Sequence, residues 1–537
     1  MMRPDAGCAL AAAIVLLSAA PVRAAEAPGY DLVVYGGTAG GVVTAVSAAR
    51  EGLKVALLEP RAHVGGMVSG GLGATDFGNK EVIGGLSREF FERVGRRYGE
   101  PIGWYFEPHV AEEVFREMLK EAGVPVFFRH RLREKTGVGK RGTKVTEIRM
   151  ENGAVFRGTI FADASYEGDL MAQAGVSYTW GREGTAQYGE SLAGVRDRTP
   201  KHQFLVRVSA HDEKGRLLPG IQAGPKGEPG QADRKVQAYN FRLCLTDVKE
   251  NQVPYPKPKG HDPRRYALLA RYIQAFGEAN GRPPRMGELM NPVRMPKGKT
   301  DTNNNGPFST DDIGANWDYP EADYATRERI WQAHVDYVQG FLYFLANDPQ
   351  VPPVLHDEIN RWGLAKDEFT DNHNWPHQLY VRETRRMVGE HVMAQKDIQD
   401  DLRKPDVIGM GSYNSDSHNV QRVATPDGAV ENEGDMQVAV TPYQIPYRVL
   451  LPKRAEAANL LVPVCFSASH VAYSTLRMEP QYMILGHAAG VAARMAARSG
   501  IAVQDVDVKA LAERLREQRA VFEWVRAPAP PASPARR

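Results

Sequence analysis

The stretch "DLVVYGGTAGGVVTAVSAAREG", Asp31 to Gly52, determines how the rest of this chain is interpreted. A buried apolar run leads into a glycine turn, and an alanine-rich segment with helical character then continues to Gly52. The next segment, "KVALLEP" (54–60), has the composition of a second buried strand. Together they predict one βαβ unit whose turn is suited to the phosphates of a nucleotide.

The glycine turn departs from the usual G-x-G-x-x-G pattern at one position. In that pattern the first glycine permits the bend, the second lets a pyrophosphate approach the backbone, and the third lets the helix pack on the strand. Thr38 replaces the second glycine, but Gly37 and Gly40 beside it leave the backbone free, and the threonine hydroxyl can itself donate a hydrogen bond. The predicted cofactor-binding residues of this turn are Gly36, Gly37, Thr38, Ala39, Gly40 and Gly41.

The residues after the second strand identify the nucleotide. Glu59 follows Gly41 by 18 positions, where a carboxylate accepts the hydroxyls of an adenosine ribose and repels the 2′-phosphate of NADP. "EPRAHVGGMVSGGLGATDFG" (59–78) then adds backbone amides at a Gly-Gly pair, which FAD needs along its pyrophosphate and ribityl chain and NAD does not. An ordinary glycine-rich surface loop is the alternative. The predicted FAD contacts here are Glu59, Pro60, Arg61, Gly65, Gly66 and Met67.

Length and charge limit the kinds of partner. With 537 residues the chain is long enough for two or three domains. Its 67 Lys and Arg nearly balance 65 Asp and Glu, and no long run of one sign occurs, so nucleic acid is not an expected partner. We expect a small-molecule substrate and an electron acceptor of unassigned identity.

The first 24 residues have the pattern of a secretory signal peptide. An Arg near the start is followed by an apolar run from Ala9 to Ala20 and by small residues around Ala24. The run is too short to span a bilayer comfortably, and Cys8 precedes it, which disfavours a lipoprotein anchor. We expect a periplasmic or secreted protein with no membrane span after cleavage, although no twin-arginine pair precedes the apolar run.

Two cysteines follow this segment, Cys244 and Cys465, and neither belongs to a C-x-x-C pair. The sequence therefore does not encode dithiol redox chemistry. A disulfide between them and two buried free thiols are both compatible with the sequence.

The character of the chain changes between about Gly175 and Pro452. A hairpin is predicted at Asn152-Gly153, after which strand–helix alternation weakens and long loops rich in Pro and Gly appear. One helix is predicted over 325–348. Its apolar stripe, assigned to the core, is Ile330, Val335, Val338, Leu342 and Leu345. A buried strand returns at 459–464, followed by a small-residue helix within 479–500.

Seven motifs spread along the chain resemble one known family. They are "VVYGGTAGGV", "LLEPRAHVGGMVSGGLGATDFG", "FADASYEGDLMAQAGVSYTWGRE", "QLYVRETRRMVGEHV", "GSYNSDSHNVQR", "TPYQIPYRVLLPK" and "NLLVPVCFSASHVAYSTLRMEPQYMILGHAAGVAA". In this order they are similar to the FAD-dependent oxidoreductase family, flavoproteins of the glutathione-reductase fold type, some of which are labelled xanthan lyase. A threonine at the middle glycine position is ordinary in that family.

The resemblance implies an α/β fold with a discontinuous Rossmann-like FAD-binding domain and an inserted α+β substrate domain. The FAD-binding domain would comprise 30–175 and 453–503, and the substrate domain 176–452. A C-terminal helix (504–526) and a disordered tail (527–537) would follow. The strand in "IFADASYEGD" (160–169) would return under the flavin, which makes Asp163, Ala164 and Ser165 cofactor neighbours.

Flavin oxidation of a substrate predicts a positive potential near N1 and the C2 carbonyl, because hydride transfer to N5 leaves negative charge there. The helix beginning near Glu479 would point its amides at this region, with Gln481 and Tyr482 also at the cofactor. Arg477, immediately before this helix, is predicted to add to the positive potential. The alternative role for Arg477 is an ion pair with a surface acid.

A proton acceptor is needed if an alcohol or amine is oxidised, and histidine is the usual one. His470 is the first candidate because it lies between the returning strand and the flavin helix. His418 is the second, with Asp416 close in sequence. A structural role is the alternative for each.

Three further residues are candidates for substrate binding. Arg385 and Arg386 would anchor an anionic or polyhydroxylated substrate or hold the domains together, and Tyr443 would line the pocket or pack in the core. His63 lies two residues before Gly65, closer than the histidine that carries flavin covalently in the succinate dehydrogenase type, so we predict non-covalent FAD. The sequence predicts no metal centre.

Two other functions are compatible with these residues. One is a lyase or isomerase that uses FAD as a scaffold, and the other is a periplasmic binding protein without catalysis. The favoured function is an exported FAD-dependent oxidoreductase that transfers hydride from a small polar, sugar-like or otherwise hydroxylated substrate to flavin N5.

Overall fold

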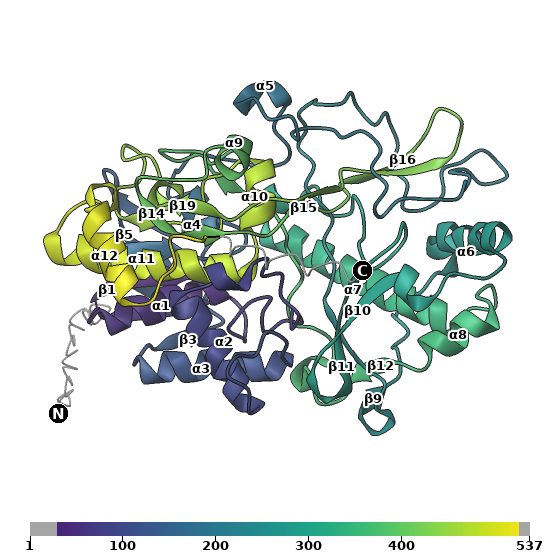
Figure 1. The fold of residues 1–537 in the computed structure, drawn as a ribbon, viewed down its shortest axis with the longest axis horizontal. Helices are drawn as coiled ribbons and strands as arrows, with labels where there is room; N and C mark the ends of the chain where they lie inside the picture. Colours follow the sequence, from purple (N-terminus) through teal and green to yellow (C-terminus); the bar gives the residue numbers. More distant parts are fainter. Residues whose placement is uncertain (1–28, 526–537) are drawn as a thin grey trace, which may run out of the picture.

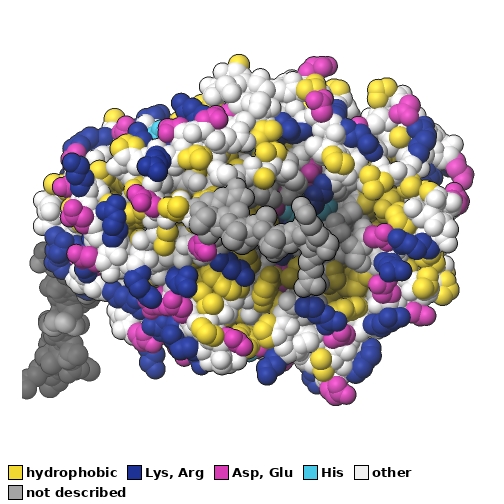
Figure 2. Space-filling view, viewed as in Figure 1, with side chains coloured by type: hydrophobic (Ala, Val, Ile, Leu, Met, Phe, Trp, Pro, Cys, Tyr) yellow, Lys and Arg dark blue, Asp and Glu magenta, His cyan; other side chains and the backbone are white. Residues whose placement is uncertain are grey.

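The computed structural model describes residues 29–525. Figure 1 shows two parts side by side, one built from both ends of the chain and the other from its middle. The predicted signal peptide and tail lie outside the described residues. Within 29–525, the helices are too short or too polar to cross a membrane. Lys and Arg alternate with Asp and Glu over the face in Figure 2, in line with a net charge of +2.

A seven-stranded sheet forms the first part. Six of its strands have the order β3-β2-β1-β6-β5-β4, and they are β1 (Gly29–Tyr35), β2 (Val55–Glu59), β3 (Val126–Phe128), β4 (Val138–Arg141), β5 (Lys144–Arg149) and β6 (Val155–Asp163). β1 is central and parallel to both β2 and β6. It is central because Leu32, Val33 and Val34 are fully buried and supply apolar side chains to both faces. The antiparallel β5–β6 pair is the hairpin predicted at Asn152-Gly153.

The C-terminal segment returns to this sheet. β20 (Leu460–Leu461) pairs in parallel with Phe161 and Ala162 of β6, which is the discontinuous arrangement that the resemblance implied. α11 (Glu479–Ser499) then packs along α1 (Ala39–Arg50) at very close range. A Cβ on Gly486 would lie 2.3 Å from the carbonyl oxygen of Gly40, so only glycine allows this approach.

Three further helices pack against α1 and α11. α2 (Gly85–Arg97) and α3 (Pro108–Glu121) meet through the stacked rings of Phe90 and Phe115, whose centroids are 4.3 Å apart. α12 (Val508–Glu517) packs against α11.

The inserted part contains a five-stranded sheet, β10-β11-β8-β12-β9, with three helices beside it. Its elements are β8 (Leu243–Thr246), β9 (Gln252–Val253), β10 (Met290–Arg294), β11 (Lys299–Asn304), β12 (Gly363–Ala365), α6 (Ala267–Asn280), α7 (Tyr324–Asn347) and α8 (Pro353–Ile359). α7 matches the predicted helix. Of its predicted stripe, Val338, Leu342 and Leu345 are fully buried, and Ile330 and Val335 are partly buried.

Short ribbons and helices complete the described chain. The ribbons pair β7 (Tyr178–Thr179) with β13 (Arg386–Met387), β14 (Val407–Gly411) with β19 (Tyr443–Pro446), β15 (Ser415–Ser417) with β18 (Met436–Val438), and β16 (Gln421–Ala424) with β17 (Val430–Glu433). The short helices are α4 (Asp169–Gln173), α5 (Thr185–Tyr188), α9 (Gln395–Gln399) and α10 (His470–Leu476). Cys244 and Cys465 are both free and buried, so of the two possibilities the structure has the free thiols.

Candidate cofactor and substrate site

The glycine turn lies at the carboxyl end of β1, where ligands bind in open α/β sheets. Gly36 has φ +102°, and a Cβ on it would lie 2.5 Å from the backbone nitrogen of Ser165. A Cβ on Gly41 would lie 1.9 Å from the carbonyl oxygen of Gly36. The first and third glycines are therefore required sterically, as their positions in the motif predict.

Thr38 uses its hydroxyl inside the protein. It is the N-cap of α1, accepting a 3.1 Å hydrogen bond from the Gly41 amide, and it donates one of 2.8 Å to the carbonyl oxygen of Ala164. The hydroxyl does donate a hydrogen bond, as the sequence allowed, and the acceptor is a carbonyl of the protein. The cap joins the turn to the segment after β6, and the amides of Ala39 and Gly40 begin the helix.

Glu59 stands at the end of β2 beside the turn. Its Oε2 accepts a 2.8 Å hydrogen bond from the Gly37 amide, and its Oε1 accepts one of 2.7 Å from the Arg61 amide. Burial raises the pKa of Glu59 to about 7. Each carboxylate oxygen retains a second lone pair, which suits it to the ribose hydroxyls.

One tyrosine, Tyr166, connects the Gly65-Gly66 loop to the start of α11. The Met67 amide donates a 2.9 Å hydrogen bond to the Tyr166 hydroxyl, which donates one of 2.6 Å to Oε1 of Glu479. A Cβ on Gly66 would lie 2.3 Å from this hydroxyl. Tyr166 was not predicted, because its contact partners lie far away in the sequence.

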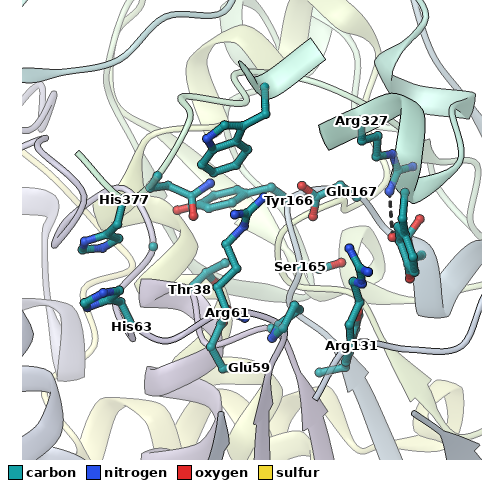
Figure 3. Close-up of a pocket in the computed structure, with 18 of the residues that line it drawn as sticks. Thr38, Glu59, Arg61, His63, Arg131, Ser165, Tyr166, Glu167, Arg327 and His377 are labelled. Atoms are coloured by element: carbon teal, nitrogen blue, oxygen red, sulfur yellow. Dashed lines mark hydrogen bonds and ion pairs between the residues drawn. The ribbon is translucent and has the colours of Figure 1, made fainter. Parts of the chain in front are cut away.

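A cavity opens above the turn and is lined by both parts of the molecule (Figure 3). From the first part come predicted residues, Gly36, Thr38, Glu59, Pro60, Arg61, Gly66 and Ser165. The inserted part adds residues that sequence reasoning missed, Tyr319, Tyr324, Arg327, Glu328, Trp331, His377 and Gln378. Arg61 extends across the cavity, and its guanidinium lies 3.7 Å from the centroid of the Trp331 ring. We call this space the cofactor cavity.

The other predicted cofactor residues lie around this cavity. Asp163 supports its wall, because its Oδ1 accepts the Ser165 hydroxyl at 2.7 Å and its Oδ2 accepts the Met171 amide at 2.7 Å. Burial raises the pKa of Asp163 to about 6. Ala164 contributes the carbonyl that Thr38 binds. Tyr482 packs on Gly40, whose added Cβ would lie 3.0 Å from the Tyr482 carbonyl oxygen.

Buried polar atoms without partners gather at the start of α11. Among the described residues, Arg477 Nε, Glu479 Oε2 and both amide atoms of Gln481 have no hydrogen-bond partner. Such atoms cost about 1–3 kcal/mol each unless a ligand or water satisfies them. Together with the glycine turn and Glu59, these unpaired atoms fit a nucleotide cofactor that extends from the turn to the start of α11 and supplies hydrogen-bond partners there.

The structure has a second, strongly polar cavity. The loop that begins at Gly65 links the two cavities, because Gly66 lines the cofactor cavity and Ala74, Thr75 and Asp76 line the second one. The other lining residues include Tyr105, Lys201, His202, Arg242, Asn291, Asn303, Asn304, Asn305, Tyr413, Asp416, His418 and Gln437. We call this space the polar cavity.

His418 lines the polar cavity and is oriented by an aspartate that the sequence did not reveal. Its Nδ1 lies 2.8 Å from Oδ2 of Asp311, whereas Asp416, the predicted partner, lies 3.9 Å from Nε2. Burial lowers the pKa of His418 well below its usual value, so the ring is neutral at neutral pH. Nδ1–H donates to Asp311 in this arrangement, which leaves the lone pair on Nε2.

His470, the first predicted base, occupies a different environment. Its Nδ1 lies 2.9 Å from Oε2 of Glu383, and its amide donates a 2.9 Å hydrogen bond to Glu183. Within residues 29–525, the linings of the two cavities do not include His470. The structure thus places it in a buried network with Glu183, Glu383 and Arg386.

The three residues predicted to bind substrate make contacts within the protein instead. Arg386 is fully buried between Glu183 and Glu383, and Arg385 pairs with Asp169 at 2.7 Å. Tyr443 is buried, and its hydroxyl lies 2.9 Å from that of Thr475. Because Arg385 and Arg386 join segments far apart in the chain, their contacts match the alternative of holding the domains together. Core packing is the corresponding alternative for Tyr443.

Arg477 borders the polar cavity from behind. Its Nη2 donates a 2.7 Å hydrogen bond to the Asp416 carbonyl, and its Nη1 donates one of 3.1 Å to the Tyr380 hydroxyl. It therefore holds a buried positive charge between α11 and the polar cavity.

Comparisons with known proteins agree with a flavin site. The family model described as FAD dependent oxidoreductase matches residues 31–515. A comparison with curated proteins gives no match. Solved structures with partial similarity include NikD, described as an unusual amino acid oxidase essential for nikkomycin biosynthesis. It is 14% identical, with 29% of this chain and 57% of that chain covered and a TM-score of 0.23.

Two more solved structures have similar values. The L-amino acid deaminase from Proteus vulgaris is 16% identical, with 29% of this chain and 52% of that chain covered and a TM-score of 0.23. The OxyS anhydrotetracycline hydroxylase from Streptomyces rimosus is 14% identical, with 38% and 44% covered and a TM-score of 0.22. The matched regions span about half the length of these three proteins.

Proposed function

Because the chain belongs to the FAD dependent oxidoreductase family, we propose that it oxidises a small polar, hydroxylated substrate by hydride transfer to the flavin. The polar cavity is the observation that carries this proposal. Its lining mixes amides, carboxylates and cations with the tyrosines Tyr105 and Tyr413. A hydroxyl both donates and accepts, so a polyhydroxylated molecule such as a sugar can pair with each kind of group.

In this proposal His418 takes the hydroxyl proton. Its neutral ring holds a lone pair on Nε2, and Asp311 fixes the tautomer through Nδ1 at 2.8 Å. When the C–H bond breaks, the O–H proton passes to Nε2, and Asp311 stabilises the imidazolium that forms. FAD, when bound, accepts the hydride and so supplies the two-electron chemistry.

Other side chains would arrange the charges around this step. Arg477 keeps a fixed positive charge beside α11, where its Nη2 holds the Asp416 carbonyl. Arg242 forms a bidentate pair with Asp301, 2.7 Å for each contact, so it presents a rigid cation to the polar cavity. Glu59, Gly36 and Ser165 would hold the nucleotide end of the cofactor, which we propose is bound without a covalent link.

The test is anaerobic reduction of the purified yellow holoprotein by a panel of sugars, polyols, amino acids and amines. Loss of the flavin absorbance band with a sugar or polyol supports the proposal. Turnover without bleaching would favour the lyase or isomerase function, and binding without either would favour a binding protein. A yellow band that survives denaturing gel electrophoresis would contradict non-covalent binding.

We also propose that the protein is exported to the periplasm or medium by its N-terminal 24 residues. This proposal rests on the sequence pattern described above. Mass spectrometry of the protein from cell fractions tests it. A mature N-terminus near Ala25 outside the cytoplasm supports export, and an intact Met1 in the cytoplasmic fraction contradicts it.

A further inference from the structure

Two histidines and a glutamate from three separate elements meet beside the cofactor cavity. His63 lies on the loop after β2, Glu112 on α3, and His377 on the inserted segment after β12. One ligand-type atom of each lies within 4.8 Å of the others. Figure 3 shows the His63 and His377 rings lying parallel, and their centroids are 3.9 Å apart. Both histidines line the cofactor cavity and also a neighbouring acidic cavity, so they form the wall between the two.

His377 has hydrogen-bonding capacity that the described residues leave unused. Both ring nitrogens are shielded from solvent and have no hydrogen-bond partner. His63, in contrast, is engaged by Oε2 of Glu112 at 3.0 Å and Oδ2 of Asp371 at 3.1 Å. These contacts occupy both ring nitrogens of His63, whereas both ring nitrogens of His377 remain unpaired among the described residues.

The charges around this group favour a cation. Glu112, Glu113 and Asp371 all line the acidic cavity, and Arg116, the arginine in the same lining, pairs with Oε1 of Glu112 at 2.5 Å. An anion such as a phosphate would meet these carboxylates and be repelled. The orphaned nitrogens of His377 are therefore better matched by a positively charged ligand than by the cofactor phosphates.

A second cluster of carboxylates and a histidine, beside the same acidic cavity, is neutralised by a lysine. Glu107, His109 and Glu368 also bring ligand-type atoms together. There the Lys299 ammonium lies 2.7 Å from both Glu107 and Glu368 and supplies the cation. In the first group Arg116 Nη2 lies 2.5 Å from Oε1 of Glu112, but among the described residues both ring nitrogens of His377 remain without a partner.

We propose that His63, Glu112 and His377 bind one divalent transition-metal ion such as Zn²⁺, with a water molecule as the fourth ligand. Two imidazoles and one or two carboxylates are a donor set that Zn²⁺ accepts at about 2.0–2.2 Å, and imidazole disfavours Mg²⁺ and Ca²⁺. Small rotations of the side chains would bring atoms now within 4.8 Å to that geometry. The ion would tie the inserted part to α3 and to the loop after Glu59, at the edge of the cofactor cavity.

Metal analysis of the FAD-loaded protein tests the site. The protein is treated with chelator, exchanged into buffer, titrated with ZnCl₂ alone, and measured for bound zinc and melting temperature. We expect one zinc per chain and a higher melting temperature with zinc, because an ion that binds only the folded state stabilises it. His377→Gln and Glu112→Gln should each weaken zinc binding by about tenfold or more, since losing even an outer-shell partner costs that much.

Two matched variants act as controls. His109→Gln and Glu113→Gln change residues that line the same acidic cavity but lie outside the proposed ligand set, and both should bind zinc as the wild type does. Flavin content is measured in every variant. The proposal is overturned if the wild type takes up no zinc, if the control variants lose zinc as His377→Gln does, or if His377→Gln loses flavin while its zinc affinity stays unchanged.

Discussion

The Tyr166 hydroxyl donates a 2.6 Å hydrogen bond to Oε1 of Glu479, although the two residues are 313 positions apart. Tyr166 follows β6, and Glu479 is the first residue of α11. The same hydroxyl accepts a hydrogen bond from the Met67 amide in the Gly65-Gly66 loop. One side chain thus joins three segments, the one after β6, the Gly65-Gly66 loop and the start of α11.

Replacing Tyr166 by Phe should weaken both folding and cofactor binding. The change leaves the buried Met67 amide and Glu479 carboxyl without this partner, at about 1–3 kcal/mol of unfolding free energy. We expect the dissociation constant for FAD to rise about tenfold, because the loop carrying Met67 loses its anchor. Urea unfolding and flavin fluorescence titration measure the two effects.

Tyr447→Phe is the matched control for that variant. Tyr447 is equally buried, and its hydroxyl donates a 2.8 Å hydrogen bond to the Val503 carbonyl, outside the linings of both cavities. It should lose similar stability and keep its FAD affinity. Equal FAD affinities for Tyr166→Phe and the wild type would refute the anchoring role.

Replacing Gly41 by Ala should disrupt the nucleotide turn. The new Cβ would overlap the Gly36 carbonyl oxygen at 1.9 Å, and backbone atoms cannot move aside cheaply. We expect a loss of about 3 kcal/mol or more in unfolding free energy and purification without bound flavin. Gly29→Ala, at the start of β1 with open space around its Cβ, should change stability by less than about 0.5 kcal/mol. A yellow, stable Gly41→Ala protein would show that the turn is not the cofactor site.

Substitutions of the two candidate histidines should affect different properties, the rate of flavin reduction for His418 and the stability of the fold for His470. His418→Gln should slow flavin reduction by the substrate about 10²–10⁴-fold with flavin content unchanged, because the proton acceptor is removed. His470→Gln should instead lower stability by about 1–3 kcal/mol, since it disturbs a buried hydrogen bond to Glu383. Stopped-flow reduction and urea unfolding of both variants make the comparison. The assignment of the base to His418 fails if His470→Gln alone slows reduction.

Glu479 should make the protein less stable as the pH rises. Burial raises its pKa from 4.5 to about 8, so the folded state keeps a proton that the unfolded chain has released. The unfolding free energy therefore falls between pH 4.5 and about 8, by at most about 1.4 kcal/mol per pH unit from this group. Glu479→Gln has no proton to lose there.

Urea unfolding of wild type and Glu479→Gln at pH 5 and pH 8.5, both with saturating FAD, tests this linkage. The stability of the wild type relative to the variant should be greater at pH 5 than at pH 8.5. Parallel pH profiles for the two proteins would mean that the Glu479 carboxyl is already ionised at pH 5.

Features that depend on local pattern were predictable. The apolar run of β1, the spacing of Gly36, Gly41 and Glu59, and the stripe on α7 follow from strand and helix periodicity and from steric needs of a single turn. The return of β20 was implied by the resemblance. The prediction of FAD as cofactor also comes from the sequence, because the glycine turn, Glu59 and the family motifs are each recognisable in a continuous stretch or by their order along the chain.

Features that depend on contacts between distant segments were not predictable. Trp331 belongs to a helix assigned to the core, yet it reaches Arg61 across the cofactor cavity. His418 and His470 are alike in sequence, and only their partners, Asp311 and Glu383, distinguish a ring at the polar cavity from a ring in an ion network. No local signal marks Asp311 as the partner of His418.

The sequence by itself determined the nucleotide-binding unit, its glycine turn and the FAD chemistry, because these arise from residues a few positions apart. Only the tertiary structure decided which polar side chains face the cavities and which neutralise one another in the interior. That division follows from burial, since a charged or polar side chain removed from water must find a partner, and the partner is supplied by whichever distant segment the fold brings beside it.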